Sequence, residues 1–469
     1  MRLFFRNFGY TFSSNLISTL ISSIVVLILP KVIGTSEYGY VQLYTLYCSY
    51  VAFLHLGVVD GIYLRHGGEY YDDLDKKLLS SEFFLFFVIE LIFGSVVFVV
   101  GVASAGEPQD AVLAMCIGVA VVLVNTKAFL QYIFQCTARM KEYSCVVSIE
   151  RIVYLVLVLA GLLLGIKEFY YIVLFDLLGR FFALVYAAKQ AKELIFVKPK
   201  PSIASIRALI QDIRCGLSLT FSYLVSISIV SVIRLSIEKA WNIETFAKVS
   251  LSFSVSNMLL MFIRAIAQVL FPLLRRTNEE MLSSLYNTMR TCLMIPLLGM
   301  LVCYYPAKVI LSAWLPQYAD SLVYMALLFP MCVFESKMSM LIETYMKTLR
   351  KEKWLLLVNV VTVSLSVITT LITTYWLHNL DLAVASIVFL LAFRCVFAEL
   401  LLSTMLDVNV KMDIALELAL TVIFIVASWF VGGIAGLSIY AVAYLIYLFM
   451  KRKDVAFVAN MALRVVRRA

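Results

Sequence analysis

Long apolar stretches separated by short polar segments make up most of this sequence, and this pattern limits the folds open to it. Hydrophobic residues account for 62% of the 469 residues and charged residues for only 15%, whereas a soluble protein is roughly half apolar and a quarter charged. A helix crosses the hydrocarbon layer of a membrane with roughly 20 apolar residues. The sequence therefore predicts an all-α polytopic membrane protein rather than a set of soluble domains.

We expect about 14 transmembrane helices, the first of them a retained span rather than a cleaved signal peptide. The expected spans are 11–33, 38–61, 82–104, 111–135, 145–165, 168–187, 214–236, 246–272, 289–309, 319–346, 353–376, 381–406, 412–431 and 433–450. Two closely spaced pairs, 145–165 with 168–187 and 412–431 with 433–450, could each be one bent helix. Twelve or thirteen spans therefore also fit the sequence.

The distribution of basic residues predicts the orientation in the membrane. With the N-terminus in the cytoplasm, the segments on that side hold 27 Lys and Arg, and the outer segments with their adjoining span ends hold 5. Because Lys and Arg concentrate in cytoplasmic loops, we expect both termini in the cytoplasm. The net charge of +9 is then explained by contact with anionic lipid headgroups, and we expect no nucleic-acid partner.

The spacing of the spans predicts a domain organisation. We expect an N-terminal six-helix lobe at 1–187, a cytoplasmic amphipathic linker at 188–213, a C-terminal six-helix lobe at 214–406, an extra helix pair at 407–450 and a basic cytoplasmic tail at 451–469. The linker and the tail are basic and amphipathic, as is typical of segments that lie on a membrane surface.

A weak internal repeat indicates that the two lobes are related by a pseudo-twofold axis. The segment LPKVIGTSEYGYVQL at 29–43 aligns with IEKAWNIETFAKVSL at 237–251, at an offset of 208 residues. Each segment joins the first helix of a six-helix lobe to its second. Repeated bundles of this kind are common in transporters.

Ionisable residues within the expected spans are the first candidates for a functional site, because each costs roughly 2.5 kcal/mol or more at the bilayer centre unless it meets water or a partner. The bases are Lys127, Arg151, Arg180, Arg234, Arg264, Lys337 and Arg394; the acids are Asp60, Glu90, Glu150, Asp176, Glu335, Glu343, Glu399 and Glu417. We expect Glu150, Arg151, Glu343 and Glu417 to lie near helix ends and extend toward the headgroups.

Two interpretations of the deeper charges stay open. They can line a hydrated cavity between the two lobes, where bases on several helices would bind an anion such as a diphosphate. Alternatively they form interhelical salt bridges that only hold the bundle together. Asp176 and Arg180, spaced i and i+4, are expected to neutralise each other on one helix.

Motifs for nucleotide hydrolysis and metal-dependent catalysis are missing from the sequence. It contains no G-x-x-x-x-G-K-[ST] and no H-E-x-x-H. Asp73-Leu74-Asp75 spells D-x-D, but in a short cytoplasmic loop without a domain around it. We therefore expect no enzyme activity, no cofactor and no metal site.

A run of about forty residues resembles a known family. LPKVIGTSEYGYVQLY is followed by an aromatic-rich helix and then by HLGVVDGIYLRHGGEYYD. This order is similar to that of the polysaccharide transporters of the MOP flippase superfamily, in particular the Wzx-type exporters of lipid-linked oligosaccharide repeat units. Over the rest of the chain the agreement is one of architecture, in helix number, layout and short loops.

The resemblance implies a flippase that moves polyprenyl-diphosphate-linked oligosaccharides across the bacterial cytoplasmic (inner) membrane by alternating access, driven by ions or the membrane potential. Its partners would be the lipid-linked glycan, membrane lipids, and glycan polymerase and chain-length machinery. The expected substrate-binding bases are Lys127, Arg180, Arg234, Arg264, Lys337 and Arg394, and the expected coupling or gating acids are Asp60, Glu90, Asp176, Glu335 and Glu399.

Three other functions compete with this one. The first is a multidrug or metabolite cation antiporter of the related extrusion branch, which typically has twelve spans. The second is a membrane-embedded glycosyl- or acyltransferase that would depend on Asp73 and Asp75. The third is a flippase for a peptidoglycan or teichoic acid precursor, which the sequence separates least well from the first choice.

The motif around Asp60 predicts a gate hinge at the inner mouth. We expect Asp60 to pin the cytoplasmic end of the second span, by pairing with Arg65 or a basic loop, and Gly67 and Gly68 to permit a sharp turn with positive φ. Asp60→Ala should then reduce flipping while substrate binding stays largely intact. Lost binding with normal gating, measured in the same vesicles, would contradict the hinge.

Overall fold

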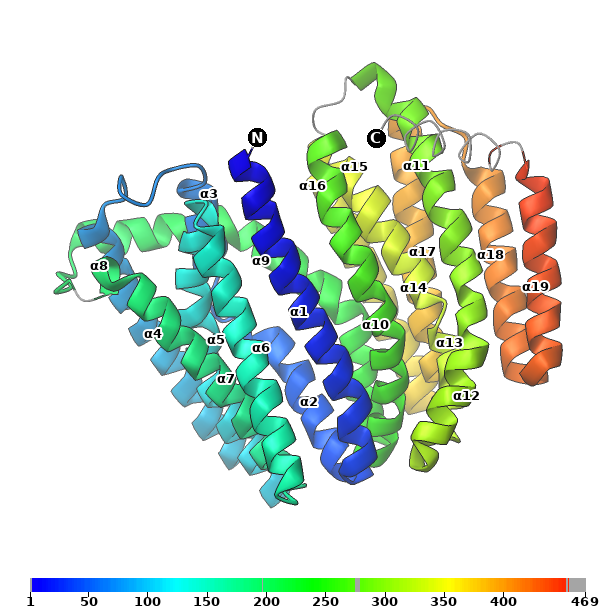
Figure 1. The fold of residues 1–469 in the computed structure, drawn as a ribbon, viewed down its shortest axis with the longest axis horizontal. Helices are drawn as coiled ribbons and strands as arrows, with labels where there is room; N and C mark the ends of the chain where they lie inside the picture. The colour runs from blue at the N-terminus through cyan, green and yellow to red at the C-terminus, as the bar shows by residue number, and fades with distance from the viewer. Residues whose placement is uncertain (1, 196, 275–278, 453, 455–469) are drawn as a thin grey trace. The chain divides into compact units, whose positions relative to one another are not determined.

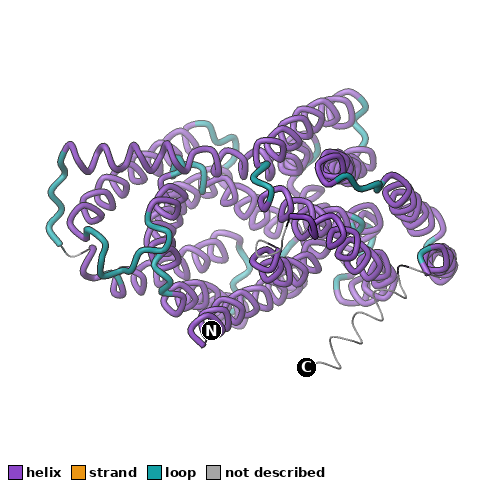
Figure 2. The backbone as a smooth tube through the Cα atoms, turned by 90° about the horizontal axis from the view of Figure 1, so that it is seen from above, coloured by secondary structure: helices purple, strands orange, loops and turns teal. Residues whose placement is uncertain are grey.

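The computed structural model describes the backbone of residues 2–195, 197–274, 279–452 and 454, and within these the side chains outside 2–8, 259, 261–281 and 284. This part of the chain consists of helices joined by short loops, without a strand (Figure 2). The chain divides into two compact units, residues 1–227 and 228–469.

The first unit is built from eight helices and the beginning of a ninth. These are α1 (Arg2–Val32), α2 (Thr35–Val51), α3 (Val58–Arg65), α4 (Lys76–Ala103), α5 (Pro108–Cys136), α6 (Met140–Leu163), α7 (Phe169–Gln190), α8 (Lys192–Ile195) and α9 (Ile203–Ala240). Helix α5 packs against α2, α3, α4 and α7, and α1 packs on α6. Helix α5 is therefore the central element of this unit.

The second unit contains the end of α9 and ten further α-helices. These are α10 (Ile243–Leu274), α11 (Glu279–Met300), α12 (Tyr304–Trp314), α13 (Tyr324–Leu328), α14 (Met331–Lys337), α15 (Glu343–Thr348), α16 (Glu352–Thr370), α17 (Leu380–Leu406), α18 (Lys411–Val426) and α19 (Gly433–Met450). A π-helical turn at Met338–Ile342 joins α14 to α15, and this stretch packs against α10 and α17.

Twelve described stretches are long and apolar enough to cross a membrane, and each coincides with an expected span. The chain is thus an all-α, multi-pass membrane protein. Two expected spans are not among the twelve. The span 246–272 falls in α10, which has undescribed side chains, and the span 38–61 is divided between α2 and α3.

The prediction of one helix over 38–61 is wrong, because the chain turns between α2 and α3. Leu56 and Gly57 have positive φ angles of 51° and 87°, which a continuing α-helix does not tolerate. Hydropathy does not register this turn, because residues 52–58 are themselves mostly apolar. Asp60 consequently lies in the first turn of α3 rather than at the end of a long span.

Helix α9 includes the end of the expected linker and the whole of the expected span that follows it. The expected linker ends at 213 and the next span begins at 214, but α9 runs from Ile203 to Ala240 as one helix, which Figure 1 shows in green. No Gly or Pro turn interrupts it, since Gly216 adopts helical geometry. The division between the two units, at 227/228, falls inside this helix.

The expected repeat has matching helix boundaries in the two units. Helix α1 ends at Val32 and α2 begins at Thr35, and α9 ends at Ala240 and α10 begins at Ile243. Both pairs of boundaries are 208 residues apart. The aligned side chains are also buried in both units: Tyr38 with Phe246, Val41 with Val249 and Leu43 with Leu251. The same positions therefore serve the core in each unit, as a duplicated bundle would require.

Helix α3 crosses α9 at a very short distance, because glycines face each other there. A Cβ atom on Gly61 would lie 2.1 Å from the backbone oxygen of Asp212, and one on Gly216 would lie 1.9 Å from the backbone oxygen of Gly57. The Thr220 hydroxyl donates a hydrogen bond of 2.6 Å to Asp60 one turn further along α9. Small residues thus let the two backbones touch.

We predict that Gly61→Ala destabilises the protein by about 1–3 kcal/mol or more, because the new methyl group overlaps backbone that cannot move aside as a side chain would. Thermal unfolding in detergent should show a clearly lower midpoint. Gly106→Ala is the matched control, since nothing lies within 4 Å of that position. Equal midpoints for the two variants would contradict the close helix crossing.

Candidate functional site

The first unit contains a buried cluster of bases and acids on α5, α6 and α7. Lys127 forms an ion pair with Glu150, and both side chains are at most one-tenth exposed. Arg180 Nε lies 2.6 Å from Asp176 Oδ2, and the Tyr44 hydroxyl donates to the same oxygen at 2.9 Å. The expected pair of Asp176 and Arg180 is therefore confirmed.

Bases outnumber acids in this cluster, which we call the first-unit cluster. Arg151 Nη2 lies 3.8 Å from Glu150, and its side chain is 32% exposed. Together with Lys127 and Arg180 it makes three bases against the carboxylates of Glu150 and Asp176. The expectation that Glu150 extends toward the headgroups is wrong, because the carboxylate turns inward to Lys127.

Glu90, an expected coupling acid, is fully buried on α4. Its Oε2 accepts a hydrogen bond of 2.7 Å from the Asn125 amide, which also donates to the backbone oxygen of Val51. Its Oε1 accepts no hydrogen bond from any described residue. This carboxyl group is therefore held by one neutral donor and lies apart from the ion pairs above.

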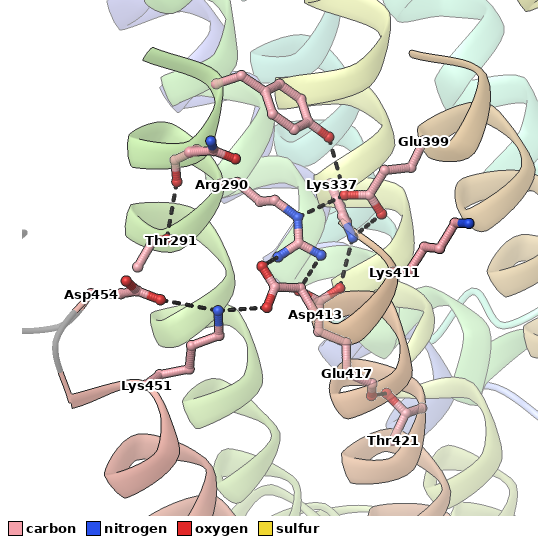
Figure 3. A network of polar contacts seen from close by, with 12 residues as sticks. Arg290, Thr291, Lys337, Glu399, Lys411, Asp413, Glu417, Thr421, Lys451 and Asp454 are labelled. Atoms are coloured by element: carbon pink, nitrogen blue, oxygen red, sulfur yellow. Dashed lines mark hydrogen bonds and ion pairs between the residues drawn. The ribbon is translucent and has the colours of Figure 1, made fainter. Parts of the chain in front are cut away.

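A larger network connects α11, α14, α17 and α18 in the second unit (Figure 3). Lys337 Nζ contacts Glu399 and lies 2.7 Å from Glu417. Arg290 contacts the same two acids, at 2.7 Å from Glu399 Oε1 and 2.8 Å from Glu417 Oε1. The four side chains are at most 4% exposed.

The network extends to the edge of the unit through Asp413. Arg290 Nη1 lies 3.0 Å from Asp413 Oδ2, and Lys451 lies 2.5 Å from Asp413 Oδ1. Lys451 also lies 3.0 Å from Asp454, so three bases face four acids. Since Asp413 and Glu417 belong to α18, the network fastens the C-terminal helix pair to the rest of the unit. The expectation that Glu417 extends toward the headgroups is wrong for this reason.

Arg290 is a member of this network that sequence reasoning missed, because the residue was counted with a cytoplasmic loop. The helical spacing of the apolar residues around Arg290 could have identified it. Tyr286, Met294 and Leu297 recur on one face with Arg290, and all three are buried in α11. A base in line with a buried apolar face predicts a buried charge with a partner.

Arg394 on α17 contacts an amide and two acids in the second unit. Its Nε donates to the Asn359 side chain at 2.8 Å, and its two terminal nitrogens lie 3.1 Å from Glu335 and 3.3 Å from Glu343. Arg394 is 3% exposed, whereas the two acids are 19% and 24% exposed. The guanidinium group is therefore enclosed, with its acids nearer the surface.

Arg234, another expected base, has contacts of a different kind. Arg234 on α9 donates to the Ser250 hydroxyl at 3.0 Å and lies over the rings of Phe246 and Phe253. Arg264 belongs to α10, and its side chain lies outside the described residues. The expected bases whose side chains are described are thus distributed over several local environments.

The expected pair of Asp60 and Arg65 does not form. Asp60 accepts its hydrogen bond from Thr220, and Arg65 Nη1 lies 2.6 Å from Asp212 on α9. Both residues therefore find their partners on α9 rather than in each other. Gly68 has the expected positive φ, at 99°, and Gly67 does not.

The D-x-D aspartate Asp75 has a structural role here. It is the N-cap of α4, and its side chain accepts hydrogen bonds of 3.1 Å from the backbone N–H groups of Lys77 and Leu78. This capping accounts for an aspartate at the start of the helix without any catalytic function.

Comparisons with known proteins give a family and a fold for this chain. The family described as "Polysaccharide biosynthesis protein" matches residues 4–278, more than half of the chain. No curated protein sequence gives a significant match.

Solved transporters have a similar fold. A structure of the lipid II flippase MurJ in an inward closed conformation has a TM-score of 0.59 at 12% identity, over 96% of this chain and 99% of that one. An inward-facing multidrug resistance MATE transporter of the MOP superfamily has a TM-score of 0.60 at 12% identity, over 87% and 95%. A MATE transporter in the straight conformation has 0.57 at 13%, over 86% and 96%. At these identities the likeness shows the fold alone.

We predict that Lys337→Met destabilises the protein by about 3–5 kcal/mol, because Arg290 is then the one buried cation among the described residues that contacts Glu399 and Glu417. Adding Glu417→Gln to Lys337→Met should recover part of this loss. Lys411→Met is the control, since Lys411 is exposed beside the network. Thermal unfolding in detergent measures all three, and a harmless Lys337→Met would contradict the network.

Proposed function

Because the chain belongs to the polysaccharide biosynthesis protein family, we propose that it flips polyprenyl-diphosphate-linked oligosaccharide units across the bacterial cytoplasmic membrane by alternating access. The family match carries this proposal. It is supported by a fold shared with a lipid II flippase over nearly the whole chain. Both termini would face the cytoplasm, in line with the distribution of basic residues.

The excess of bases in the first-unit cluster favours an anionic substrate. Lys127, Arg151 and Arg180 face two carboxylates, and Arg151 is the most exposed of the three bases. A diphosphate carries the negative charge that such a cluster lacks. We therefore add Arg151 to the substrate-binding bases expected from the sequence. Because its side chain is the most exposed of the three, a diphosphate would lose the least water on reaching it.

Arg394 offers a second contact for a diphosphate, through exchange of partners. Its guanidinium group is already oriented by Asn359 and by the partly exposed Glu335 and Glu343. A diphosphate presents oxygens in a geometry that guanidinium matches with two parallel hydrogen bonds. Substrate entry would move Glu335 and Glu343 away from Arg394, so binding stays reversible, as transport requires.

The drive for transport would come from an ion gradient or the membrane potential. The chain contains no nucleotide-hydrolysis motif, and Glu90, Asp176, Glu335, Glu399 and Asp60 remain the proposed coupling or gating acids. Glycan polymerase and chain-length machinery are the proposed partners on the outer side of the membrane.

We predict that Arg264→Ala and Arg394→Ala each lower the transbilayer movement of a polyprenyl-diphosphate glycan about tenfold or more, because a charge-assisted hydrogen bond contributes about 1.5–3 kcal/mol. The assay uses purified protein in vesicles with labelled substrate. Arg394→Lys should give an intermediate rate, since it keeps the charge and loses the planar fork.

Arg350→Ala, at an exposed arginine of the same unit, is the control and should transport normally. The alternative expected from the sequence, a multidrug or metabolite cation antiporter, has the fold of a multidrug resistance MATE transporter. Dye efflux by the wild-type protein, combined with no glycan movement, would replace our proposal by that one. Faster movement of a peptidoglycan or teichoic acid precursor than of an oligosaccharide unit would change the assigned substrate.

A further inference from the structure

Glu82 is a carboxylic acid at a position that the fold treats as hydrophobic core. It lies on the buried face of α4 between Leu79 and Phe86, and its exposed fraction is 0%. The apolar side chains of the surrounding core include Ile62 from α3 and Leu209 from α9. A residue in this position would ordinarily be Leu or Val, so an acid there requires an explanation.

Neither oxygen of Glu82 accepts a hydrogen bond from any described residue. Asp212 on α9 is also fully buried, and its Oδ2 likewise has no hydrogen-bond partner in the described part of the chain. Arg65 is the cation at this place, and it is engaged by Asp212 Oδ1 at 2.6 Å and by the backbone oxygen of Ala208 at 3.0 Å. Glu82 thus lacks the donors that an ionised carboxylate needs.

The charged groups that act on Glu82 come from three places. They are Asp212 on α9, Arg65 on α3, and Asp75 at the start of α4 itself. His66, after the end of α3, acts on Asp212. From α5 and α8, no titratable group of the described residues acts on Glu82. Glu82 therefore competes with Asp212 for one guanidinium group if both carboxyl groups are ionised.

The contacts around Glu82 hold α9 and the segment before it against α3 and α4, and we call this place the junction. The Ser80 hydroxyl donates to the backbone oxygen of Val197 at 3.1 Å, and the backbone N–H of Lys200 donates to the Ser81 hydroxyl at 3.1 Å. Both bonds bind the segment before α9 to α4, next to Glu82. The ion pair of Arg65 with Asp212 and the glycine crossing bind α9 itself to α3.

We propose that Glu82 is a proton-binding site whose occupancy holds α9 closed against α3 and α4. In the closed junction Glu82 carries a proton, so Arg65 needs to neutralise only Asp212. Loss of that proton leaves a second carboxylate facing Asp212 in an apolar core, and opening of the junction to water relieves the repulsion. Closure therefore takes up one proton.

This site acts on the helix that connects the two units. Helix α9 continues past the division at 227/228 without a break, so the junction at its beginning restrains an element that belongs to both. The inference holds for any substrate, and it differs from the coupling acids expected from the sequence because Glu82 was not among them.

Spin labels on Lys77→Cys and Arg207→Cys test the proposal, since both positions are exposed, one at the start of α4 and one on α9. The nine native cysteines are first replaced by serine or alanine. In nanodiscs without substrate, the distance between the labels should change from short to long between about pH 5 and pH 9. For one proton, the ratio of the two populations changes tenfold per pH unit around the midpoint.

Glu82→Gln should keep the short distance at every pH, because it cannot ionise. Arg65→Gln should move the transition to lower pH, since Asp212 then also lacks its cation. Asp73→Asn, in the exposed loop before α4, should leave the wild-type transition unchanged. Infrared difference spectra should lose one carboxylic acid band in Glu82→Gln.

A wild-type pH transition that persists in Glu82→Gln would overturn the proposal, and so would a wild-type distance that does not depend on pH. Glu82→Leu covers the case in which Glu82→Gln does not fold, because an apolar side chain suits this core. No substrate enters these measurements, so failure of the proposed glycan transport would leave their outcome unaffected.

Discussion

The cost of placing charge in an apolar environment governs the arrangement of both units. An ionised side chain away from water needs an opposite charge and hydrogen bonds, and each helix bundle supplies them from its neighbouring helices. Lys337 illustrates the result, with Glu399 and Glu417 on two other helices as its partners. Such pairs give the bundle directional contacts that Leu and Val side chains facing lipid cannot provide.

The acids that pair with these bases also determine how easily each base can bind an anionic substrate. A base that already has an acid beside it costs little to bury, but an incoming anion must displace that acid. Arg394 has partners at 3.1 and 3.3 Å that are partly exposed, whereas Lys337 has partners that are fully enclosed. Exchange is therefore easier at Arg394 than at Lys337, and the two bases suit different roles: reversible binding and structural attachment of α18.

Hydropathy predicted most of the helices because lipid imposes length and apolarity on a span regardless of tertiary detail. It failed where local geometry decides, as at Gly57, whose positive φ divides an apolar stretch into α2 and α3. The pair of Asp176 and Arg180 was predictable from spacing on one helix. Partners on different helices were not, since a sequence does not say which faces meet. Arg290 and Glu82 were left out of the candidate buried charges because they lie near the ends of expected spans, although the helical faces that carry them are apolar.

The two units treat buried carboxylates differently, and this bears on where protons can act. In the second unit, Glu399 and Glu417 each contact two bases. In the first unit, Glu82 and one oxygen of Glu90 accept no hydrogen bond from the described residues. A carboxyl group without donors changes its protonation state when its surroundings open, whereas a doubly paired one resists change. The proton-binding site that we propose at Glu82 therefore lies on α4 of the first unit, whereas the paired carboxylates of the second unit attach α18.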